Sequence, residues 1–347
     1  MFKSLKNFHT FSEKVYSYDV VIVYTKEELL YFYKRCLLKK IPFIILGEGS
    51  NILFLKNYYG LVVINRIFGI SIMERKKYYL VNCNSGEKWR KLVNICMYNK
   101  IYGLENLAFI PGCVGSAVIH NIGAYGMEIK KFCKYVEVIN LLNGNIYKIN
   151  KKLCDFKYRG SLFKNIYFGK YYAVLSVCLK ITKNWFPCLL HKELFFLKNQ
   201  YVSSNYIYSL INKIRKKKIP NPKFLGNAGS FFKNPVVEKM YINKYKNVPF
   251  KNFSKNSIIL SASYMIDKCY LKGLKIGNSF VYKYNPLIIV SYPNNKKSNS
   301  IIKLAKYIHL CVFKKFSVNL EPEVRFISYY GEINSYNFLK NMKKTKF

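Results

Sequence analysis

The segment IPGCVGSAVIHNIGAYG, residues 110–126, contains no Lys, Arg, Asp or Glu, although Lys and Arg make up 58 of the 347 residues of this chain. A solvated loop does not have this composition, so the segment must pack against something. Four glycines lie in it among other small residues and Ser116. The residues alone support two interpretations equally: the segment forms a backbone wall against a large flat ligand, or it is a tightly packed buried turn.

The length of the chain predicts two or three domains rather than one small core. Hydrophobic residues make up 51% of the sequence, which is enough to build such cores. The apolar runs are as long as strands and none reaches the length of a transmembrane helix, and the N-terminus lacks the apolar core of a secretory signal. We therefore expect a cytoplasmic protein without membrane segments.

The formal net charge of +41 raises the possibility of a nucleic-acid-binding protein. However, lysine supplies the excess, and only seven of the basic residues are arginine. The lysines are spread along the chain among many Asn, Ile, Tyr and Phe residues, a composition typical of an AT-rich coding sequence. We interpret the charge as codon drift, which leaves weak nonspecific binding to polyanions and no specific nucleic-acid partner.

The ten cysteines include no C-x-x-C pair and no nearby histidine at the spacing of metal ligands. In a cytoplasmic chain they are expected to be buried thiols that fill apolar space. The sequence predicts no metal site.

Periodicity predicts alternating strands and helices in the first half, and so an α+β block over residues 15–185. Thr25 and Glu28 predict a capping box at the start of a helix, and Asn143-Gly144 predicts the turn of a hairpin. Residues 186–225 are helical and polar and end in the proline-containing segment 219–223, a plausible hinge. Strands are expected at 18–25, 41–47, 60–65, 78–83, 171–181 and 286–292, the hairpin at 135–150, and helices at 25–40, 85–100, 256–271 and 298–314.

The turn LGEGSN, residues 46–51, follows a buried strand and offers backbone N–H groups to an anion such as a pyrophosphate. By itself this indication is weak, because glycine turns after strands are common. The turn is not G-x-G-x-x-G and no capped helix follows it, so a Rossmann dinucleotide site is not supported.

Five motifs in order give a specific resemblance. LGEGSNILFL, GLENLAFIPGCVGSAVIHNIGAYG, YRGSLFK, GNAGSFFKNP and LEPEVRF together resemble the UDP-N-acetylenolpyruvoylglucosamine reductase (MurB) family, in its type with a longer middle loop. The resemblance covers essentially the whole chain. It implies an α+β protein with an FAD-binding domain of the vanillyl-alcohol-oxidase (PCMH) type in two subdomains and a C-terminal α+β substrate-binding domain.

On this resemblance the FAD-binding domain covers residues 15–185, with subdomains of about 1–66 and 67–200. The substrate-binding domain covers 219–319, and residues 320–347 form a strand and tail that return to the FAD domain. A monomer is expected.

The implied reaction belongs to peptidoglycan synthesis and has two halves. NADPH reduces FAD, and reduced FAD then gives hydride to C3 of the enolpyruvyl group of UDP-N-acetylglucosamine enolpyruvate. A proton must reach C2, which yields UDP-N-acetylmuramate. The alternatives are another FAD oxidoreductase of the same fold with a different substrate, or a basic nucleic-acid-binding protein.

The resemblance implies three catalytic residues. Ser230 matches the proton donor, although a serine in a glycine-rich turn is ordinarily solvent-exposed. Glu323 matches a residue that aids the acid–base step or stabilises the intermediate; residues 321, 323 and 325 are expected on one face of a strand. Arg159 matches the residue that faces the enolpyruvyl carboxylate or enolate, and an arginine kept in so lysine-rich a chain favours a need for the planar fork.

The resemblance also implies binding residues. Those expected to bind FAD are Gly47, Glu48, Gly49, Ser50, Asn51, Ile110, Pro111, Gly112, Gly115, Ser116, Asn121, Ile122, Gly123, Ala124 and Arg325. Those expected to bind substrate are Tyr125, Arg215, Lys218, Asn234 and Asn285. Where relatives of the longer type carry a lid tyrosine this chain has His191, which puts that role in doubt, and His120 is given no role.

Overall fold

The computed structural model describes residues 2–292 and 299–342, and the chain divides into two compact units. Unit 1 is built from three separate stretches, Met1–Asp19, Gly49–Gly60 and Lys216–Phe347. Unit 2 is built from Val20–Glu48 and Leu61–Arg215. The glycine turn predicted to hold an anion, residues 46–51, therefore crosses from unit 2 into unit 1 between Glu48 and Gly49.

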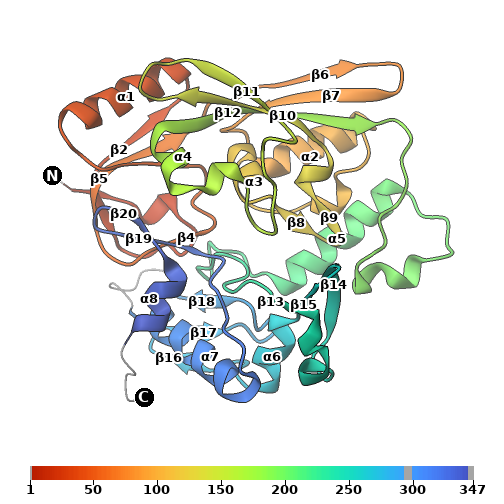
Figure 1. Ribbon diagram of the computed structural model, residues 1–347. Coiled ribbons are helices and arrows are strands. Elements are labelled where there is room, and N and C mark those ends of the chain that lie inside the picture. Colours follow the sequence, from red (N-terminus) through yellow and green to blue (C-terminus); the bar gives the residue numbers. More distant parts are fainter. Residues whose placement is uncertain (1, 293–298, 343–347) are drawn as a thin grey trace. The chain divides into compact units, whose positions relative to one another are not determined.

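The largest sheet lies in unit 2 and has five antiparallel strands in the order β11-β10-β12-β7-β6 (Figure 1). Its strands are β6 (Ile70–Glu74), β7 (Tyr78–Asn84), β10 (Cys133–Asn140), β11 (Ile146–Asn150) and β12 (Tyr172–Thr182). Helix α3 (Val114–Ile119) packs on β7 and β12. The segment 110–126, which we name the charge-poor segment, thus lies against the main sheet of this unit through α3.

The predicted hairpin at 135–150 is confirmed. β10 and β11 pair from Tyr135↔Asn150 to Ile139↔Ile146, and Gly144 in the connection has a φ of 82°. This is the left-handed region that glycine occupies without strain.

A second sheet, of order β1-β2-β5-β3, carries helix α1 (Lys26–Leu38), and its strands are β1 (Lys3–Ser4), β2 (Tyr16–Val23), β3 (Phe43–Leu46) and β5 (Tyr58–Asn65). The capping box is confirmed in a modified form. The Thr25 side chain accepts from the Glu28 amide, and Glu28 in turn accepts at 2.7 Å from the amide of Tyr24 rather than from that of Thr25. These bonds satisfy N–H groups that a helix start leaves open.

The main core of unit 2 is organised around Trp89 of helix α2 (Trp89–Tyr98), which is fully buried. The indole N–H donates to the carbonyl of Leu107 at 2.8 Å, so the polar group of the largest core side chain is satisfied. Seven of the ten cysteines are buried and the other three half-buried, and all are free thiols, as predicted. Burial raises the pKa of Cys113 to about 11, which keeps that thiol protonated and unreactive.

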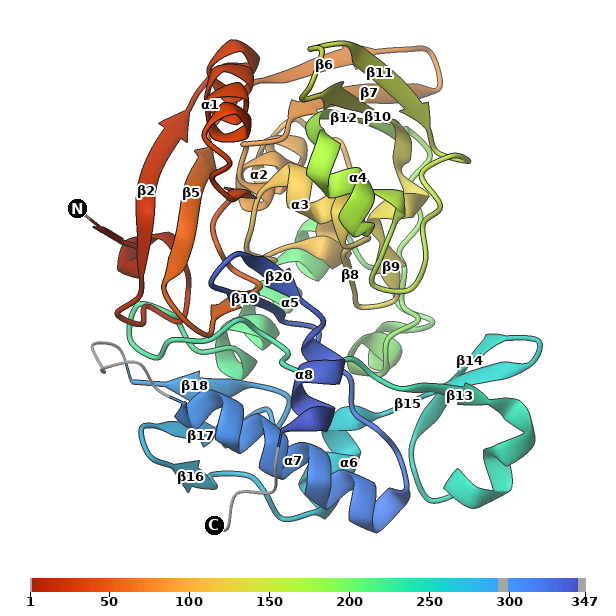
Figure 2. The same ribbon diagram turned by 60° about the vertical axis from the view of Figure 1, so that its left-hand side comes forward.

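Unit 1 contains helices α6 (Ala262–Lys268) and α7 (Ser300–Phe316), which pack together, and α7 covers a three-stranded sheet (Figure 2). That sheet is β16 (Lys275–Ile276), β17 (Ser279–Val281) and β18 (Ile289–Ser291). Two further sheets are β13-β15-β14 and β20-β19-β4. Their strands are β4 (Ile52–Phe54), β13 (Val236–Glu238), β14 (Phe250–Ser254), β15 (Ser257–Leu260), β19 (Arg325–Ser328) and β20 (Gly331–Ile333).

The expected helix at 256–271 is wrong in its first part. Residues Ser257–Leu260 form β15 in the centre of its sheet, and α6 begins only at Ala262. The Ser261 side chain accepts from the Tyr264 amide and so caps the helix. Ser261 therefore marks the boundary that apolar periodicity missed, because a run as short as SIIL suits either a strand or a helix.

The remaining elements are short, apart from α5, and are α4 (Ile166–Tyr171), α5 (Ser204–Lys218), α8 (Ser335–Asn341), β8 (Gly123–Ala124), β9 (Met127–Glu128), and the 3-10 turns η1 (Lys6–Phe8), η2 (Glu105–Leu107), η3 (Ile129–Lys131), η4 (Leu162–Lys164), η5 (Lys192–Leu197) and η6 (Lys239–Tyr245). Among the helices of residues 2–292 and 299–342, none has the length and apolar character needed to cross a membrane.

Candidate active site

Within unit 2, the start of the glycine turn contacts the charge-poor segment. The Glu48 carboxylate accepts from the Gly112 amide at 2.8 Å, and a Cβ added at Gly47 would lie 2.9 Å from the sulfur of Cys113. Lys88 lies 3.5 Å from the other carboxylate oxygen. The two segments expected to bind one cofactor are thus joined by a charge-assisted hydrogen bond.

Within unit 1, the second half of the turn offers backbone donors. Gly49 has a φ of 58°, and in the described part of the chain the amide N–H groups of Gly49 and Ser50 donate to no acceptor. Consecutive amides next to a left-handed residue form a concavity that binds anions. The turn therefore fits the pyrophosphate of a dinucleotide.

Gly49 and Gly229 make a matched pair for substitution by alanine. Both have positive φ, 58° and 68°, but a Cβ at Gly49 would lie 2.1 Å from the carbonyl oxygen of Phe8, whereas nothing lies within 4 Å of one at Gly229. We expect Gly49→Ala to lower the free energy of unfolding by about 3 kcal/mol or more, and Gly229→Ala by only about 1 kcal/mol of backbone strain. Urea denaturation measures both, and equal losses would contradict the close packing at Gly49.

The charge-poor segment is largely a packed turn, and this explains several of its small residues. A Cβ at Gly115 would lie 2.7 Å from that of Ser85, so glycine is needed there for packing of α3 on the end of β7. The Ser116 hydroxyl donates to the carbonyl of Cys113 at 2.7 Å. Gly112–Gly115 are buried, whereas Pro111 before them and residues 122–124 after the helix are exposed or half-buried, so a ligand can be met at either end of the segment but not in its middle.

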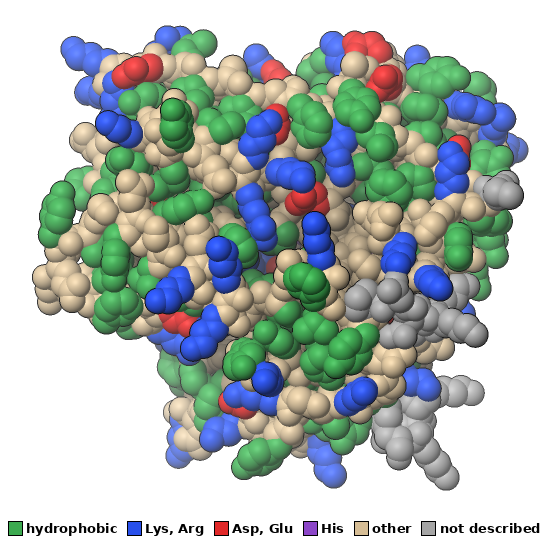
Figure 3. All heavy atoms as spheres, turned by 180° about the vertical axis from the view of Figure 1, so that it is seen from behind, with side chains coloured by type: hydrophobic (Ala, Val, Ile, Leu, Met, Phe, Trp, Pro, Cys, Tyr) green, Lys and Arg blue, Asp and Glu red, His purple; other side chains and the backbone are tan. Residues whose placement is uncertain are grey.

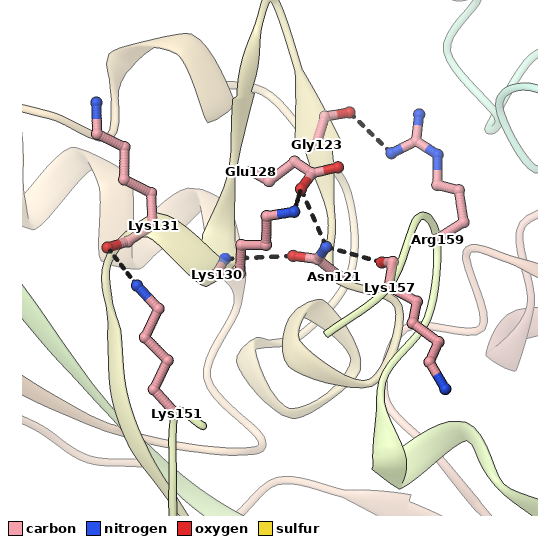
Figure 4. A network of polar contacts seen from close by, with 8 residues as sticks. All are labelled: Asn121, Gly123, Glu128, Lys130, Lys131, Lys151, Lys157 and Arg159. Atoms are coloured by element: carbon pink, nitrogen blue, oxygen red, sulfur yellow. Dashed lines mark hydrogen bonds and ion pairs between the residues drawn. The ribbon is translucent and has the colours of Figure 1, made fainter. Parts of the chain in front are cut away.

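Asn121 is fully buried, and its side chain is occupied by structural bonds (Figure 4). The amide donates to the carbonyl of Lys157 at 2.9 Å and to Glu128 at 3.2 Å, and its oxygen accepts from the amide of Lys130. Because the side chain is turned to these partners and the backbone N–H donates to the carbonyl of Val118 at 3.2 Å, only the backbone carbonyl of Asn121 is left to meet a ligand. Ile122, Gly123 and Ala124 follow it, half-buried, into the small β8–β9 hairpin.

Arg159 lies in a tight turn closed by two backbone hydrogen bonds between Lys157 and Gly160. Its φ of 57° belongs to the left-handed region, where a non-glycine residue costs about 1 kcal/mol. One guanidinium nitrogen donates to the carbonyl of Gly123 at 2.9 Å (Figure 4). An arginine held at a position suited to glycine, and aimed at the hairpin 123–128, supports a requirement for its side chain.

Tyr125 and Arg215, both expected to bind substrate, are brought together in unit 2. They share a side-chain hydrogen bond, and the ring of His191 lies edge-on to that of Tyr125 with centroids 4.9 Å apart. Burial lowers the pKa of Arg215 to about 10, and the positive charges of Arg90 and Arg159 act in the same direction. Two of the other six arginines, Arg90 and Arg159, thus lie within electrostatic reach of Arg215, an arrangement that favours a bound anion.

In unit 1 the segment Gly226–Asn234, which we name the Ser230 segment, is held by backbone bonds on both edges. On one side Phe231 donates to Leu287 at 2.7 Å, and on the other its carbonyl accepts from Glu323 at 2.8 Å. Phe231 and Phe232 are each 1% exposed and anchor the segment in the core. The two expected catalytic residues Ser230 and Glu323 therefore lie on adjoining, rigidly bonded stretches of backbone.

The small residues at positions 226, 228 and 229 of the Ser230 segment are required for different structural reasons. A Cβ at Gly226 would lie 2.4 Å from the carbonyl oxygen of Phe11, and Ala228 is buried in the core. Only Gly229, beside the half-buried Ser230, has open space around it. Of these three small residues, only Gly229 thus leaves open space next to Ser230.

The strand expected across residues 321–326 begins only at Arg325, although the predicted alternation of burial is present. Pro322 bridges to Phe232 instead, because it lacks the N–H needed to continue a sheet ladder. Asn51 links this stretch to the glycine turn. Its side-chain amide donates to the carbonyl of Glu323 at 3.3 Å, and its backbone carbonyl accepts from the backbone N–H of Arg325 at 3.1 Å.

Arg325 and the remaining substrate candidates have structural partners. The Arg325 guanidinium donates to Glu332 of β20, with Nε at 2.9 Å. The Asn234 oxygen accepts from the amide of Ala262 at the start of α6, and that of Asn285 from the amide of Leu287 in its own turn. Lys218 is half-buried at the end of α5.

Comparison with known proteins places this geometry in a family. A model of the FAD binding domain matches residues 19–150, and a model of the UDP-N-acetylenolpyruvoylglucosamine reductase C-terminal domain matches residues 221–327. The chain is 46% identical to the reductase of that name from Buchnera aphidicola subsp. Schizaphis graminum, over 96% of this chain and 97% of that protein. The chain belongs to the UDP-N-acetylenolpyruvoylglucosamine reductase family.

Other relatives agree. The UDP-N-acetylenolpyruvoylglucosamine reductase of Pasteurella multocida is 39% identical over 96% of this chain and 98% of that protein. The crystal structure of the Thermus caldophilus reductase matches with a TM-score of 0.63 over 94% of this chain and 98% of that one, at 22% identity, and so bears on the fold. The predicted fold class, an FAD-binding domain followed by a C-terminal substrate domain, is confirmed.

Sequence reasoning missed two residues that lie next to the candidate site residues Tyr125 and Arg215. Arg90 lies 3.8 Å above the ring of Phe109, and Asn106, fully buried, donates to the carbonyls of Tyr125 and Cys188. The scarcity of arginine, which singled out Arg159, was an equally good signal for Arg90. Asn106 carried no signal, since a buried Asn is recognised only once its partners are known.

Proposed function

We propose that this chain performs the two half-reactions of its family with Arg159, Ser230 and Glu323 as its chemical groups. It is an FAD-dependent oxidoreductase of peptidoglycan synthesis. Bound FAD supplies hydride transfer, from NADPH in the first half-reaction and to the enolpyruvyl group of UDP-N-acetylglucosamine enolpyruvate in the second. The observation that carries the residue assignment is the backbone bonding of the Ser230 segment to the stretch that contains Glu323.

The residues present fit FAD. The N–H groups of Gly49 and Ser50 suit its pyrophosphate, and the Glu48–Gly112 bond ties the glycine turn to the beginning of the segment 110–116. The backbone of residues 121–124 approaches the isoalloxazine ring in this proposal. Arg325 supports the glycine turn through its bond to Asn51.

Ser230 delivers the proton to C2. A serine hydroxyl is a weak acid, so it serves only against a strongly basic carbon and only when its position is fixed. The hydrogen bonds of Phe231 to Leu287 and Glu323 fix the backbone next to Ser230, and Gly229 leaves open space beside it. Glu323 assists this proton transfer or stabilises the intermediate.

Arg159 binds the enolpyruvyl carboxylate and the enolate that develops from it. Its planar fork matches two oxygens at once, which a lysine ammonium does not. Tyr125, Arg215, Lys218, Asn234 and Asn285 bind the UDP-sugar, and the paired Tyr125 and Arg215 in unit 2 supply a donor set suited to phosphate. His191, which occupies the sequence position of the family's lid tyrosine, packs on Tyr125, and we assign it no lid role.

Stopped-flow spectroscopy of the flavin tests the function. NADPH should bleach the flavin absorbance of the purified protein, and the enolpyruvyl UDP-sugar should restore it rapidly. Bleaching without restoration would favour the alternative, an FAD oxidoreductase of the same fold that acts on a different substrate. If the purified protein bound no flavin, both the proposed reductase activity and the alternative FAD oxidoreductase would be contradicted.

We further propose a cytoplasmic monomer with no specific nucleic-acid or membrane partner, and the domain boundaries 15–185, 219–319 and 320–347. Lys and Arg side chains are scattered over the face drawn in Figure 3, among apolar and neutral ones, which supports codon drift as the origin of the charge. A DNA affinity in the nanomolar range with a steep dependence on salt would contradict it. Sedimentation velocity measures the oligomeric state.

A further inference from the structure

Two titratable side chains outside the described catalytic set are buried in the N-terminal segment of unit 1. His9 is 3% exposed and Glu13 4% exposed. The imidazole Nε2 lies 3.3 Å from the backbone carbonyl of Glu13, and its ring packs edge-on against Phe54. Within the described residues, His9 Nδ1 and one carboxyl oxygen of Glu13 are buried with no hydrogen-bond partner.

The segment Phe8–Glu13, which we name the N-terminal segment, lies between two parts of the proposed site. On one side Thr10 donates to the carbonyl of Gly49 at 3.1 Å, where the Phe8 carbonyl leaves no room for a side chain. On the other side the Thr10 carbonyl accepts from Asn227 at 3.1 Å, and the carbonyl of Phe11 lies against Gly226. The backbone of Thr10 is thus hydrogen-bonded both to the glycine turn and to the beginning of the Ser230 segment.

We propose that His9 and Glu13 are positioning residues: as a buried neutral pair they fix the N-terminal segment, and through it the glycine turn and the Ser230 segment. FAD retention then depends on Glu13 staying uncharged. The inference rests on the proposed function only in naming FAD as the ligand of the turn.

The environment supports neutrality of both groups at pH 7. Burial raises the pKa of Glu13 to about 8 and lowers the pKa of His9 to about 4. The hydrogen bond between His9 and the carbonyl of Glu13 raises the pKa of His9, but this effect is smaller than that of burial. The ring of Phe54 and the backbone carbonyl of Glu13 face the His9 imidazole, and no charged side chain among the described residues shifts the pKa of His9 or of Glu13. An ionised Glu13 would have no counter-ion and would be driven towards water.

The signs of the pH effects differ for the two groups. The raised pKa of Glu13 stabilises the fold at low pH, and this contribution is lost as pH rises from the ordinary carboxyl value to about 8. The lowered pKa of His9 gives stability that is lost as pH falls from 6.5 to about 4. Below about pH 6.5 the two groups change the free energy of unfolding in opposite directions with pH, and their contributions cancel. We therefore expect the net decline of stability between about pH 6.5 and 8. Above about pH 8 the N-terminal segment itself loosens.

The test is the FAD dissociation constant of the full-length protein from pH 6.5 to 9.5, followed by flavin fluorescence, for wild type, Glu13→Gln and the exposed control Glu27→Gln. In wild type and control the constant should rise above about pH 8, approaching roughly tenfold per pH unit. Glu13→Gln, which keeps a neutral side chain of the same shape, should show no such rise. A flat wild-type profile, or the same rise in Glu13→Gln, would overturn the proposal.

A second measurement stands if Glu13→Gln fails to fold. The side-chain carboxyl carbon of Glu13, followed by ¹³C NMR in wild type and assigned with His9→Asn as a perturbed reference, should titrate near pH 8. Titration at the ordinary carboxyl pKa would overturn the proposal. Neither measurement uses the enolpyruvyl substrate, so the substrate assignment can fail by stopped-flow while this inference holds, and the reverse.

Discussion

Ser230→Ala is expected to bind FAD and to be reduced by NADPH at an unchanged rate, yet to be reoxidised by the enolpyruvyl UDP-sugar roughly 10²- to 10⁴-fold more slowly. The range is what a positioned acid contributes to a proton transfer. The fold should be intact, because the half-buried Ser230 hydroxyl makes no side-chain hydrogen bond among the residues that the structure describes, and the backbone at Ser230 is fixed by the bonds of its neighbour Phe231. Single-turnover stopped-flow separates the two half-reactions.

The control for this variant is Ser254→Ala, which removes an exposed hydroxyl in unit 1 that pairs with Ser257. Both half-reactions of the control should match wild type. Loss of NADPH oxidation in Ser230→Ala would show that the serine supports cofactor binding rather than proton delivery. Rapid reoxidation would remove Ser230 as the acid.

Arg159→Lys is expected to lower the rate of flavin reoxidation by about 10²- to 10³-fold, the loss typical when one donor to a developing oxyanion is removed. Lysine keeps the charge and the φ of 57° but cannot bond the Gly123 carbonyl and a carboxylate with one planar group. The free energy of unfolding should change by less than about 1 kcal/mol, since the turn 157–160 is closed by backbone.

Arg75→Lys is the matched control, because Arg75 is exposed at a strand end and, among the described residues, its guanidinium makes only a long contact to the carbonyl of Glu74, at 3.5 Å. Its kinetics and stability should equal those of wild type. If Arg159→Lys reoxidised at the wild-type rate, charge alone would suffice at this position and the fork argument would be wrong.

Elements with strong local signals could be predicted from the sequence. The hairpin turn at Gly144 and the cap at Thr25 depend on residues within a few positions of each other, so the sequence displays them directly. The family resemblance located Ser230 and Glu323, and the structure adds the backbone bonds that bring their segments together.

Elements decided by distant partners could not be predicted. SIIL became β15 because strands on both sides pair with it, and LEPEV stayed outside a strand because Pro322 cannot donate. The sequence predicts nothing for His9 and Glu13, which are buried. The segment that carries them packs against Gly49 and Gly226, through His9 and Phe11, and these glycines lie about 40 and 215 residues further along the chain.

The division of unit 1 into three stretches has a consequence for synthesis on the ribosome. The stretches Met1–Asp19 and Gly49–Gly60 emerge early, but their partners begin only at Lys216. At the usual pace of translation the apolar side chains of Leu5 and Phe11, fully buried in the finished protein, wait on the order of ten seconds for a core. The nascent chain is therefore expected to depend on chaperones during this interval, and a pause in translation before residue 216 should increase its aggregation.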